Sequence, residues 1–319
     1  MQKIKLIYIV SAPHSGSTLL DLILGSQSKI ESVGEIINLE KWVNNNKDCT
    51  CGQKLTNCNY WKTILEKYKE TIGAENKSIY DLITLFKSIT KKDKLLFYFF
   101  NNPSFVWDKD EIKKYGLKNY YLFKTIKEHT GKPIILDSSK EANRILKLYL
   151  SDLFEVKIIY LFRDGRANIE SFKRKASDAK RDKAKYYGPV SHTIKFILGH
   201  LIQSRILKSI DKKDVFFLDY KNFAMHPKNV IQDICRFIGI EFNEETFDLK
   251  SSKYFSNQKH HNIGGNRLRL KFIEKITYKN KWQENLSKKE KIIFHMLGGN
   301  IINKIYEKKA EKSKKLIKQ

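Results

Sequence analysis

Residues 11–18 read Ser-Ala-Pro-His-Ser-Gly-Ser-Thr and bring hydroxyls, a histidine and a glycine together. An apolar run over residues 3–10 precedes them, and the helical pattern STLLDLILGS follows Gly16. A tight glycine turn between a strand and a helix N-terminus directs free backbone N–H groups and the positive end of the helix dipole at an anion. We therefore expect an anion site formed by His14, Ser15, Gly16, Ser17 and Thr18.

The same stretch differs from the phosphate loop of nucleoside triphosphatases, GxxxxGK[ST]. Aligned on Gly16 and Thr18, the chain has Ser11 in place of the first glycine and Ser17 in place of the lysine. ATP hydrolysis is therefore poorly supported. His14 can contact the anion as a cation or as a hydrogen-bond donor. Taken alone, the stretch also fits a strand–turn–helix junction without a ligand.

A second candidate phosphate contact lies in LFRDGR (161–166), at the end of an apolar run, with Ser171 on the helix that follows. An arginine at the carboxyl end of a strand and a helical hydroxyl can share one phosphate. Ligands of α/β proteins also bind at that edge of the sheet. We expect Arg163 and Ser171 to bind a phosphate. The alternative is that the charged residues of 161–166 form surface ion pairs.

Together the two segments resemble the donor-binding motifs of sulfotransferases that use 3′-phosphoadenylyl sulfate (PAPS). The first resembles the family's 5′-phosphosulfate loop, in which Arg or Lys usually stands where this chain has His14. The second resembles the family's Arg-Asp-Pro-Arg and Ser-Phe pattern, with Gly165 in place of proline. The resemblance implies that Arg163 and Ser171 bind the donor's 3′-phosphate.

Three further segments are similar to bacterial-type members of the family: CTCGQKLTNCNYW (49–61), LDSSK (136–140) and HHNIGGNRLRL (260–270), the last followed by Trp282. The third is similar to a segment that closes over the nucleotide, which implies contacts from Gly265, Asn266 and Arg267.

The resemblance runs in patches from about residue 5 to residue 285, and Tyr220-Lys-Asn-Phe departs from the family's Tyr-Glu-Asp-Leu. It implies an enzyme that transfers a sulfuryl group from PAPS to a hydroxyl of a carbohydrate, glycolipid or small-molecule acceptor.

Such a transfer needs a base beside the acceptor hydroxyl and groups that stabilise charge on the sulfuryl and leaving oxygens. The 15–18 backbone meets the second need, with help from His14 and Lys140. Glu35 is our first choice for the base, because a strand that returns after the first helix would deliver it beside the anion site. The resemblance supports a Glu from this region. Alternatively, Glu35 caps the helix that follows it.

Other residues keep the assignment of the base open. His14, His261 and Asp137 are alternative bases, and His261 also fits a loop residue that stacks near adenine. Asp137, in LDSSK, further permits a kinase in which it binds Mg²⁺. The missing loop lysine argues against a kinase. Sulfuryl transfer requires no metal, because the leaving group is already a good one.

Cys49, Cys51 and Cys58 could begin a zinc site, but the sequence shows no fourth cysteine or suitably spaced histidine to complete it. We expect a structural loop with reduced thiols and no metal. Cys235 lies in a helical pattern and is predicted to be a core residue.

Four short apolar runs predict strands: 3–10, 133–137, 155–162 and 215–220. Helical patterns run from Gly16 to near Gly25 and from about Pro227 to Gly239. Apolar runs of this length flanked by helices are typical of a parallel sheet covered on both faces. The predicted class is α/β, and the resemblance implies a sulfotransferase fold related to that of P-loop NTPases.

We expect one domain over residues 1–300. Within it, 60–130 is predicted to be a helical insertion over one end of the sheet, and the charged stretch 173–190 a mobile loop or exposed helix. Residues 301–319 are predicted to be a basic tail that contacts anionic surfaces, with about the last dozen residues frayed.

The 319 residues include 61 Lys and Arg against 35 Asp and Glu, a formal net charge of +26, and 41% are hydrophobic. This composition excludes a disordered chain. The charge attracts anions in general, so a non-enzymatic polyanion binder is a further alternative. No RNA-binding motif appears, and we expect no specific nucleic acid partner. No segment has the ~18 consecutive apolar residues of a membrane span, and we expect a cytoplasmic protein.

Overall fold

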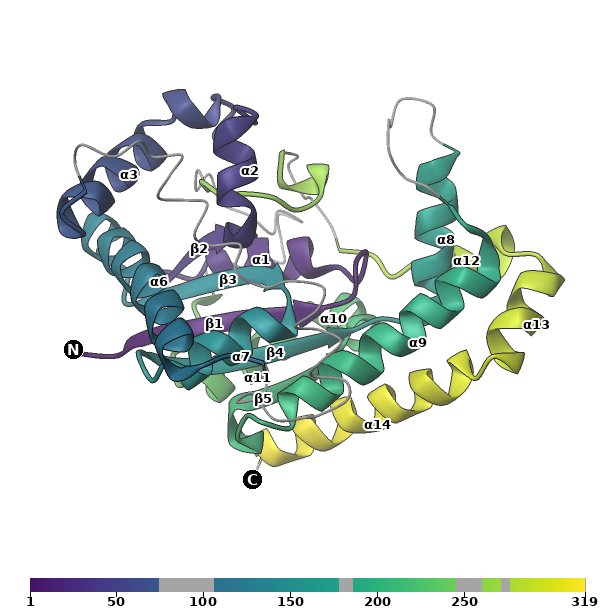
Figure 1. Cartoon of the computed structure of the whole chain (residues 1–319). Coiled ribbons are helices and arrows are strands. Elements are labelled where there is room, and N and C mark those ends of the chain that lie inside the picture. Colours follow the sequence, from purple (N-terminus) through teal and green to yellow (C-terminus); the bar gives the residue numbers. More distant parts are fainter. Residues whose placement is uncertain (75–105, 178–185, 245–259, 271–275, 319) are drawn as a thin grey trace.

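The computed structural model (Figure 1) describes residues 1–74, 106–177, 186–244, 260–270 and 276–318. Within these ranges the strands form one sheet of five, all parallel, in the order β2-β3-β1-β4-β5. Their bounds are β1 Ile4–Ser11, β2 Ile30–Gly34, β3 Ile134–Lys140, β4 Phe154–Phe162 and β5 Val215–Asp219. The predicted α/β class with a parallel sheet is confirmed.

The strand β2 is the one that the apolar runs did not predict. Its sequence is Ile-Glu-Ser-Val-Gly, so two polar residues interrupt the apolar pattern, yet all five residues are buried. Glu31 accepts a hydrogen bond from Tyr60 (2.7 Å) and pairs with Lys132 (2.9 Å), and Ser32 donates to Asp21 (2.8 Å). Because tertiary partners satisfy these polar groups, a strand without a continuous apolar run can be buried.

The central strand β1 separates two apolar layers. Its side chains alternate between the sheet faces, as strand geometry requires. Leu6, Tyr8 and Val10 join one core cluster, and Ile7 and Ile9 join the other.

Helices cover both faces of the sheet (Figure 1). The cluster around Ile7 is completed by α1 (Ser17–Gly25), α10 (Tyr220–Met225) and α11 (Pro227–Ile238). The opposite cluster takes residues from α6 (Lys109–Thr130), α7 (Ala142–Leu150), α8 (Gly165–Ala176), α9 (Gly188–Leu207) and α14 (Gly299–Lys318). The predicted ends of α1 and α11 agree with the structure, and Gly239 ends α11 with a φ of 73°.

The topology places the loop after β1 at a switch point of the sheet. From β1 the chain goes to β2 and β3 on one side, and then to β4 and β5 on the other. Ligands of open α/β sheets bind beyond the carboxyl ends of the strands where the order reverses in this way. The carboxyl end of β1 is Ser11, immediately before the predicted anion site.

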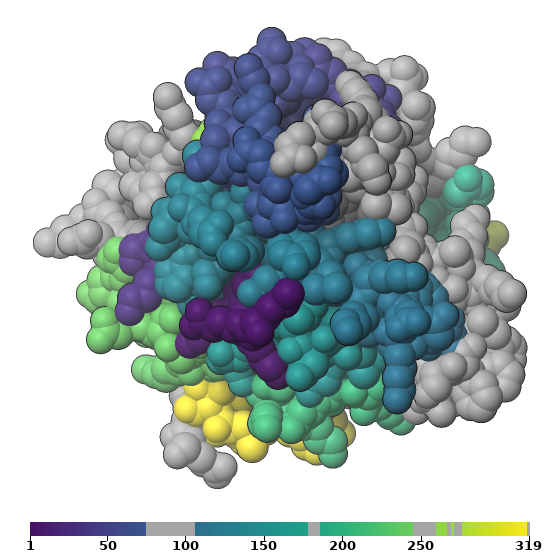
Figure 2. All heavy atoms as spheres, turned by 60° about the vertical axis from the view of Figure 1, so that its left-hand side comes forward, coloured from purple at the N-terminus to yellow at the C-terminus, as the bar shows by residue number. Residues whose placement is uncertain are grey.

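The predicted helical insertion is described at its two ends, by α3 (Asn59–Thr71) and α6, and residues 75–105 lie outside the described ranges. Preceding it are η1 (Ile36–Asn38), α2 (Leu39–Asn44) and η2 (Leu55–Asn57). The helix α6 forms part of the layer over the sheet, since Phe123 and Ile126 are fully buried in the core. Tyr120 donates to the carbonyl of Gln2 (3.0 Å), so α6 lies beside the start of β1 (Figure 2).

The prediction that about the last dozen residues are frayed is wrong. Residues 299–318 form one helix, α14, which follows α12 (Trp282–Asn285) and α13 (Lys288–Met296). Ile302, Tyr306 and Ser313 are buried at helical spacing, and Ser313 accepts a hydrogen bond from the Phe217 N–H of β5 (3.1 Å). Because many lysines stand between these positions, the sequence pattern did not indicate the buried face with which the helix packs on the sheet.

Of the charged stretch 173–190, residues 178–185 lie outside the described ranges, and its ends belong to α8 and α9. Among the described residues, no helix combines the length and the apolar character that a membrane span needs.

Candidate active site

A cavity of about 510 Å³ lies beyond the carboxyl ends of the strands, at the turn after β1. Most of the residues that the sequence predicted for donor binding or catalysis line it: His14, Gly16, Ser17, Thr18, Glu35, Lys140, Arg163, Ser171, Gly265 and Asn266. They come from five segments that are far apart in the sequence. The fold thus gathers the predicted site in one place.

The turn itself has the backbone of an anion site. His14 and Gly16 have positive φ values, 65° and 96°, and Gly16 precedes the first residue of α1. A side chain at Gly16 would collide with the ring of Tyr220. In the described part of the chain no side chain caps the start of α1, so its first N–H groups can bind an anion.

Of the two roles that the sequence allows for His14, a cation or a hydrogen-bonding imidazole, its surroundings favour the uncharged one. Burial, followed by the charges of Lys175, Lys140 and Arg163, lowers the pKa of His14 from 6.5 to about 3. Its Nδ1 accepts a hydrogen bond from Lys175 Nζ (2.9 Å), and its ring packs edge-on against Phe172. The imidazole therefore orients a neighbouring cation instead of carrying the charge.

Besides the predicted Lys140 and Arg163, two further cations, Lys175 and Arg174, line the cavity. Sequence reasoning missed both because they belong to the stretch 173–190, which was assigned to a loop or exposed helix. They stand three and four residues after Ser171 on α8. That spacing puts them on the same helical face as Ser171, and this signal could have identified them.

Arg163 is oriented by backbone and aromatic contacts. Its Nη1 donates to the carbonyl of His14 (2.8 Å), its guanidinium lies 4.7 Å from the ring centre of Tyr220, and its buried Nε has no partner among the described residues. Asp164 instead pairs with Arg166 (2.6 Å). The alternative of surface ion pairs therefore applies to Arg166 and leaves Arg163 available for a ligand.

The space beside Arg163 continues past the main cavity. Two smaller cavities of about 200 and 350 Å³ are also lined by Arg163 and Tyr220. Lys279 and Trp282 line both of them, and the Trp282 ring stacks on Arg166 at 3.8 Å. An extended ligand that starts at the turn can therefore pass Arg163.

Glu35 and Lys140 form an ion pair on the cavity wall. The second oxygen of Glu35 accepts a hydrogen bond from the Asn38 amide (3.1 Å). Glu35 stands immediately before η1, yet its side chain makes no capping hydrogen bond to that helix. The carboxylate therefore faces the cavity, and helix capping does not explain it.

The segment 260–266 closes one side of the cavity. The Glu35 N–H donates to the Ile263 carbonyl (2.6 Å), and the Asn266 N–H donates to the Thr18 hydroxyl (3.1 Å). A Cβ at Gly264 would lie 2.6 Å from that of Glu35, so only glycine fits. Arg267 opens η7 (Arg267–Leu270), and its side chain lies outside the described part of the chain.

Two predicted residues lie away from the cavity. Ser15 is fully buried, and its hydroxyl has no partner among the described residues. Asp137 is also fully buried, paired with Arg144 (2.9 Å) and bonded to the Ser139 N–H (2.9 Å). Since these groups occupy its carboxylate, Asp137 acts as a structural charge, and the alternatives of a base or a Mg²⁺ ligand at this residue are not supported.

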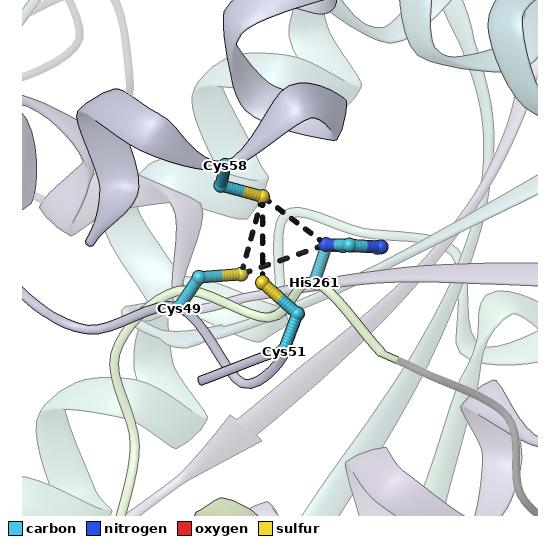
Figure 3. Close-up of side chains that lie close together, drawn as sticks. All are labelled: Cys49, Cys51, Cys58 and His261. Carbon is cyan, nitrogen blue, oxygen red and sulfur yellow. Dashed lines mark hydrogen bonds between the residues drawn. The ribbon is translucent and has the colours of Figure 1, made fainter. Parts of the chain in front are cut away.

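The structure also brings a histidine to the three clustered cysteines, which the sequence did not predict. The thiols of Cys49, Cys51 and Cys58 and the Nδ1 of His261 all lie within 4.8 Å of one another (Figure 3). His261 is separated from Cys58 by 203 residues, so no spacing motif could show the contact. His261 is not part of the lining of the main cavity, which does not support it as the base.

A family model described as "Sulfotransferase family" matches residues 7–244. No curated protein sequence matches the chain significantly. Among solved structures, the chain is similar to the "Sulfotransferase Domain from the Curacin Biosynthetic Pathway", with a TM-score of 0.52 and 16% identity over 93% of this chain and 99% of that chain.

It is also similar to the "Sulfotransferase Domain from the Synechococcus PCC 7002 Olefin Synthase", with a TM-score of 0.51 and 14% identity over 93% of this chain and 96% of that chain. At these identities the structural likeness shows the fold, and the family match covers most of the chain.

Proposed function

Because the chain belongs to the sulfotransferase family, we propose that it transfers a sulfuryl group from PAPS to a hydroxyl of an acceptor. The observation that supports this proposal is that one cavity is lined both by the turn after β1 and by Arg163 and Ser171. We propose that the turn at 14–18 binds one anionic group of the ligand and that Arg163 with Ser171 binds a second. A nucleotide that carries phosphate groups on both its 5′ and its 3′ oxygens matches this arrangement.

In the proposed complex, the first turn of α1 and the hydroxyls of Ser17 and Thr18 bind the 5′-phosphosulfate. Lys175 supplies the positive charge that the family's usual basic residue would supply at position 14. Arg163 and Ser171 bind the 3′-phosphate, because a guanidinium with a free N–H forms charge-assisted bonds to phosphate oxygens. Gly265 and Asn266 cover the nucleotide from the opposite wall.

The acceptor oxygen attacks sulfur while the bond from sulfur to the nucleotide's phosphate oxygen breaks. Glu35 takes the proton of the acceptor hydroxyl, which makes that oxygen a better nucleophile. Lys140 lies beside Glu35 and stabilises negative charge on the sulfuryl oxygens as the bond breaks. The products are a sulfate ester and adenosine 3′,5′-bisphosphate. The acceptor we propose is a carbohydrate, a glycolipid or a small molecule.

The donor assignment is tested by comparing the thermal stabilisation of the protein by adenosine 3′,5′-bisphosphate and by ATP with Mg²⁺. A ligand that binds only the folded state at about 100 times its Kd adds about 2.7 kcal/mol of stability. We expect a rise in Tm with the bisphosphate and little with ATP and Mg²⁺. Stabilisation by ATP and Mg²⁺ alone would favour the kinase alternative instead.

The role of Glu35 is tested with Glu35→Gln, which keeps the shape of the side chain and removes its basicity. We expect unchanged affinity for the bisphosphate and a turnover about 10²- to 10⁴-fold lower, the usual contribution of a general base. Glu70→Gln, at an exposed position of α3, is the matched control. A fully active Glu35→Gln protein would exclude Glu35 as the base.

A further inference from the structure

The cysteine–histidine cluster lies outside the cavity, and the proposed sulfuryl transfer makes no use of it. It joins the loop 49–58 to His261, at the start of the segment that closes the cavity (Figure 3). Cys49 and Cys58 are fully buried, Cys51 is partly buried, and the cysteines are not linked by disulfides. Three thiols and an imidazole nitrogen that converge on one point are the ligands of a structural zinc site.

Four of the separations between the ligand atoms are close to those around a tetrahedral zinc ion, and all four atoms lie within 4.8 Å of one another. With Zn–S bonds of about 2.3 Å and a Zn–N bond of about 2.0 Å, tetrahedral geometry places two sulfurs about 3.8 Å apart and sulfur and nitrogen about 3.5 Å apart. Cys58 Sγ lies 3.7 Å from the sulfurs of both Cys49 and Cys51. The His261 Nδ1 lies 3.6 Å from Cys49 Sγ and 3.2 Å from Cys58 Sγ.

We propose that Cys49, Cys51, Cys58 and His261 bind one Zn²⁺ ion. Each thiol gives up its proton to solvent and forms a Zn–S bond as a thiolate, and His261 binds through Nδ1. No electron transfer is involved. Four protein ligands complete a tetrahedral shell and leave no position for water or substrate, so the ion has a structural role.

The surroundings of the cluster hold the ligands in place, as the outer shell of a metal site does. The ring of Tyr60 stacks on the imidazole of His261, with centroids 4.4 Å apart and planes 3° apart. Trp61 Nε1 donates to the His261 carbonyl (2.7 Å). The Thr50 hydroxyl donates to the His260 carbonyl and accepts from the Asn262 N–H (2.9 Å). These contacts orient the backbone on both sides of His261.

The positive charge of Arg269 complements the negative charge that the zinc-bound site would carry. Three thiolates and Zn²⁺ carry a net charge of −1. Arg269 donates to the carbonyl of Asp48 (3.3 Å), the residue before Cys49, and its Nε and Nη1 are buried without a partner among the described residues. A buried guanidinium is stable beside a negative group, and the zinc–thiolate cluster supplies one.

The proposed ion lies where it would stabilise one wall of the cavity. Asn262, next to His261, donates to Asp21 (2.6 Å) on α1 and to Ser32 (3.0 Å) on β2. Ile263 pairs with Gly34, and Asn266 contacts Thr18. A metal that fixes His261 therefore fixes the segment 260–266 against β2 and α1. Loss of the metal should loosen the wall formed by Gly264 and Gly265.

The first experiment measures zinc in the purified full-length protein by inductively coupled plasma mass spectrometry, after extensive buffer exchange. We expect close to one zinc per chain. Replacement by Co²⁺ should then produce the visible d–d absorption and the thiolate charge-transfer bands of tetrahedral cobalt. Zinc at the background level, another metal in its place, or a disulfide among the three cysteines detected by intact mass would each overturn the proposal.

The second experiment compares Cys58→Ala with Cys235→Ala, which removes a buried cysteine from α11 outside the cluster. We expect Cys58→Ala to lose zinc and Cys235→Ala to keep it. Hydrogen exchange of the backbone amides of residues 260–266 should become faster when a chelator removes zinc from the wild-type protein. The exchange rate should fall back to its original value when Zn²⁺ is added again. Unchanged exchange in the stripped protein would contradict the structural role. Neither measurement uses PAPS, so their outcome is independent of the proposed transfer reaction.

Discussion

Arg163 is positioned by groups that use only part of its guanidinium. One nitrogen donates to the carbonyl of His14, and the flat face packs against Tyr220. The buried Nε keeps an N–H without a partner among the described residues. An unpaired buried donor is costly, and a ligand phosphate removes that cost. The arrangement therefore favours a bound anion at this residue.

Replacement of Arg163 tests this assignment. We expect Arg163→Ala to weaken the binding of adenosine 3′,5′-bisphosphate by about 10- to 100-fold, because hydrogen bonds to a charged group contribute about 1.5–3 kcal/mol. Isothermal titration calorimetry measures the change. Arg236→Ala, which removes an arginine paired with Asp233 on α11, is the control and should leave the affinity unchanged. Equal affinities in the two variants would remove Arg163 from the phosphate site.

The depressed pKa of His14 makes stability depend on pH in a defined direction. The folded chain holds His14 neutral down to about pH 3, whereas in the unfolded chain it binds a proton below pH 6.5. The unfolded state therefore takes up more protons on acidification, so stability is fully present above pH 6.5 and is lost as the pH falls toward 3.

The variant His14→Gln cannot take up this proton. Between pH 7 and pH 5 it should lose less stability than the wild type, by up to about 2 kcal/mol, since the loss is at most about 1.4 kcal/mol per pH unit below 6.5. Urea unfolding at both pH values measures the difference, and the exposed His295→Gln is the control. Parallel losses in His14→Gln and the wild type would show that His14 is not held neutral.

At the scale of elements, α14 combines many lysines with one face of buried residues that packs against the rest of the protein. Tyr306 is buried, stacks on Tyr160 and Phe162, and donates to the carbonyl of His200 (2.7 Å). Helices of this kind gain most of their stability from packing. The last part of the chain therefore belongs to the folded core, and no break separates it at residue 300.

A pair of alanine substitutions in α14 tests its packing. Tyr306→Ala should lower the free energy of unfolding by about 3–5 kcal/mol, the usual cost of removing a large buried aromatic side chain. Ile301→Ala, at an exposed position of the same helix, should change it by less than about 0.5 kcal/mol. Thermal and urea unfolding of both variants measure the contrast. Similar small effects of both would restore the view of a frayed tail.

At the scale of the whole molecule, the net charge of +26 acts together with a localised cluster of cations. Arg163, Arg174, Lys175 and Lys140 line the main cavity, against the single carboxylate of Glu35 among its lining residues. A general positive field attracts any polyanion, whereas a preorganised pocket selects an anion of the right shape. The two kinds of binding differ in their response to salt.

Salt therefore separates the proposed enzyme from a non-specific polyanion binder. Binding that depends on many phosphate contacts falls by about 10³- to 10⁵-fold between about 50 and 200 mM salt. We expect single-stranded RNA to be released over this range, while adenosine 3′,5′-bisphosphate still raises the Tm at the higher concentration. If the bisphosphate effect disappeared along with RNA binding, the polyanion alternative would be favoured.

The sequence by itself determined the features that neighbouring residues create. A strand, a glycine turn and a helix N-terminus form the site at 14–18 because backbone N–H groups and the helix dipole depend on adjacent residues. For the same reason the sequence predicted Arg163 and Ser171, the end of α11 at Gly239 and four of the five strands. These features can be predicted without knowing which distant segments pack against them.

Only the tertiary structure decided what depends on burial and on distant partners. The lowered pKa of His14, the position of Lys175 beside it, the burial of Asp137 and the buried face of α14 all follow from packing between segments. The contact of His261 with cysteines more than 200 residues away is of the same kind. Desolvation and proximity are properties of the packed chain, so no local pattern could show that a histidine completes the cysteine cluster.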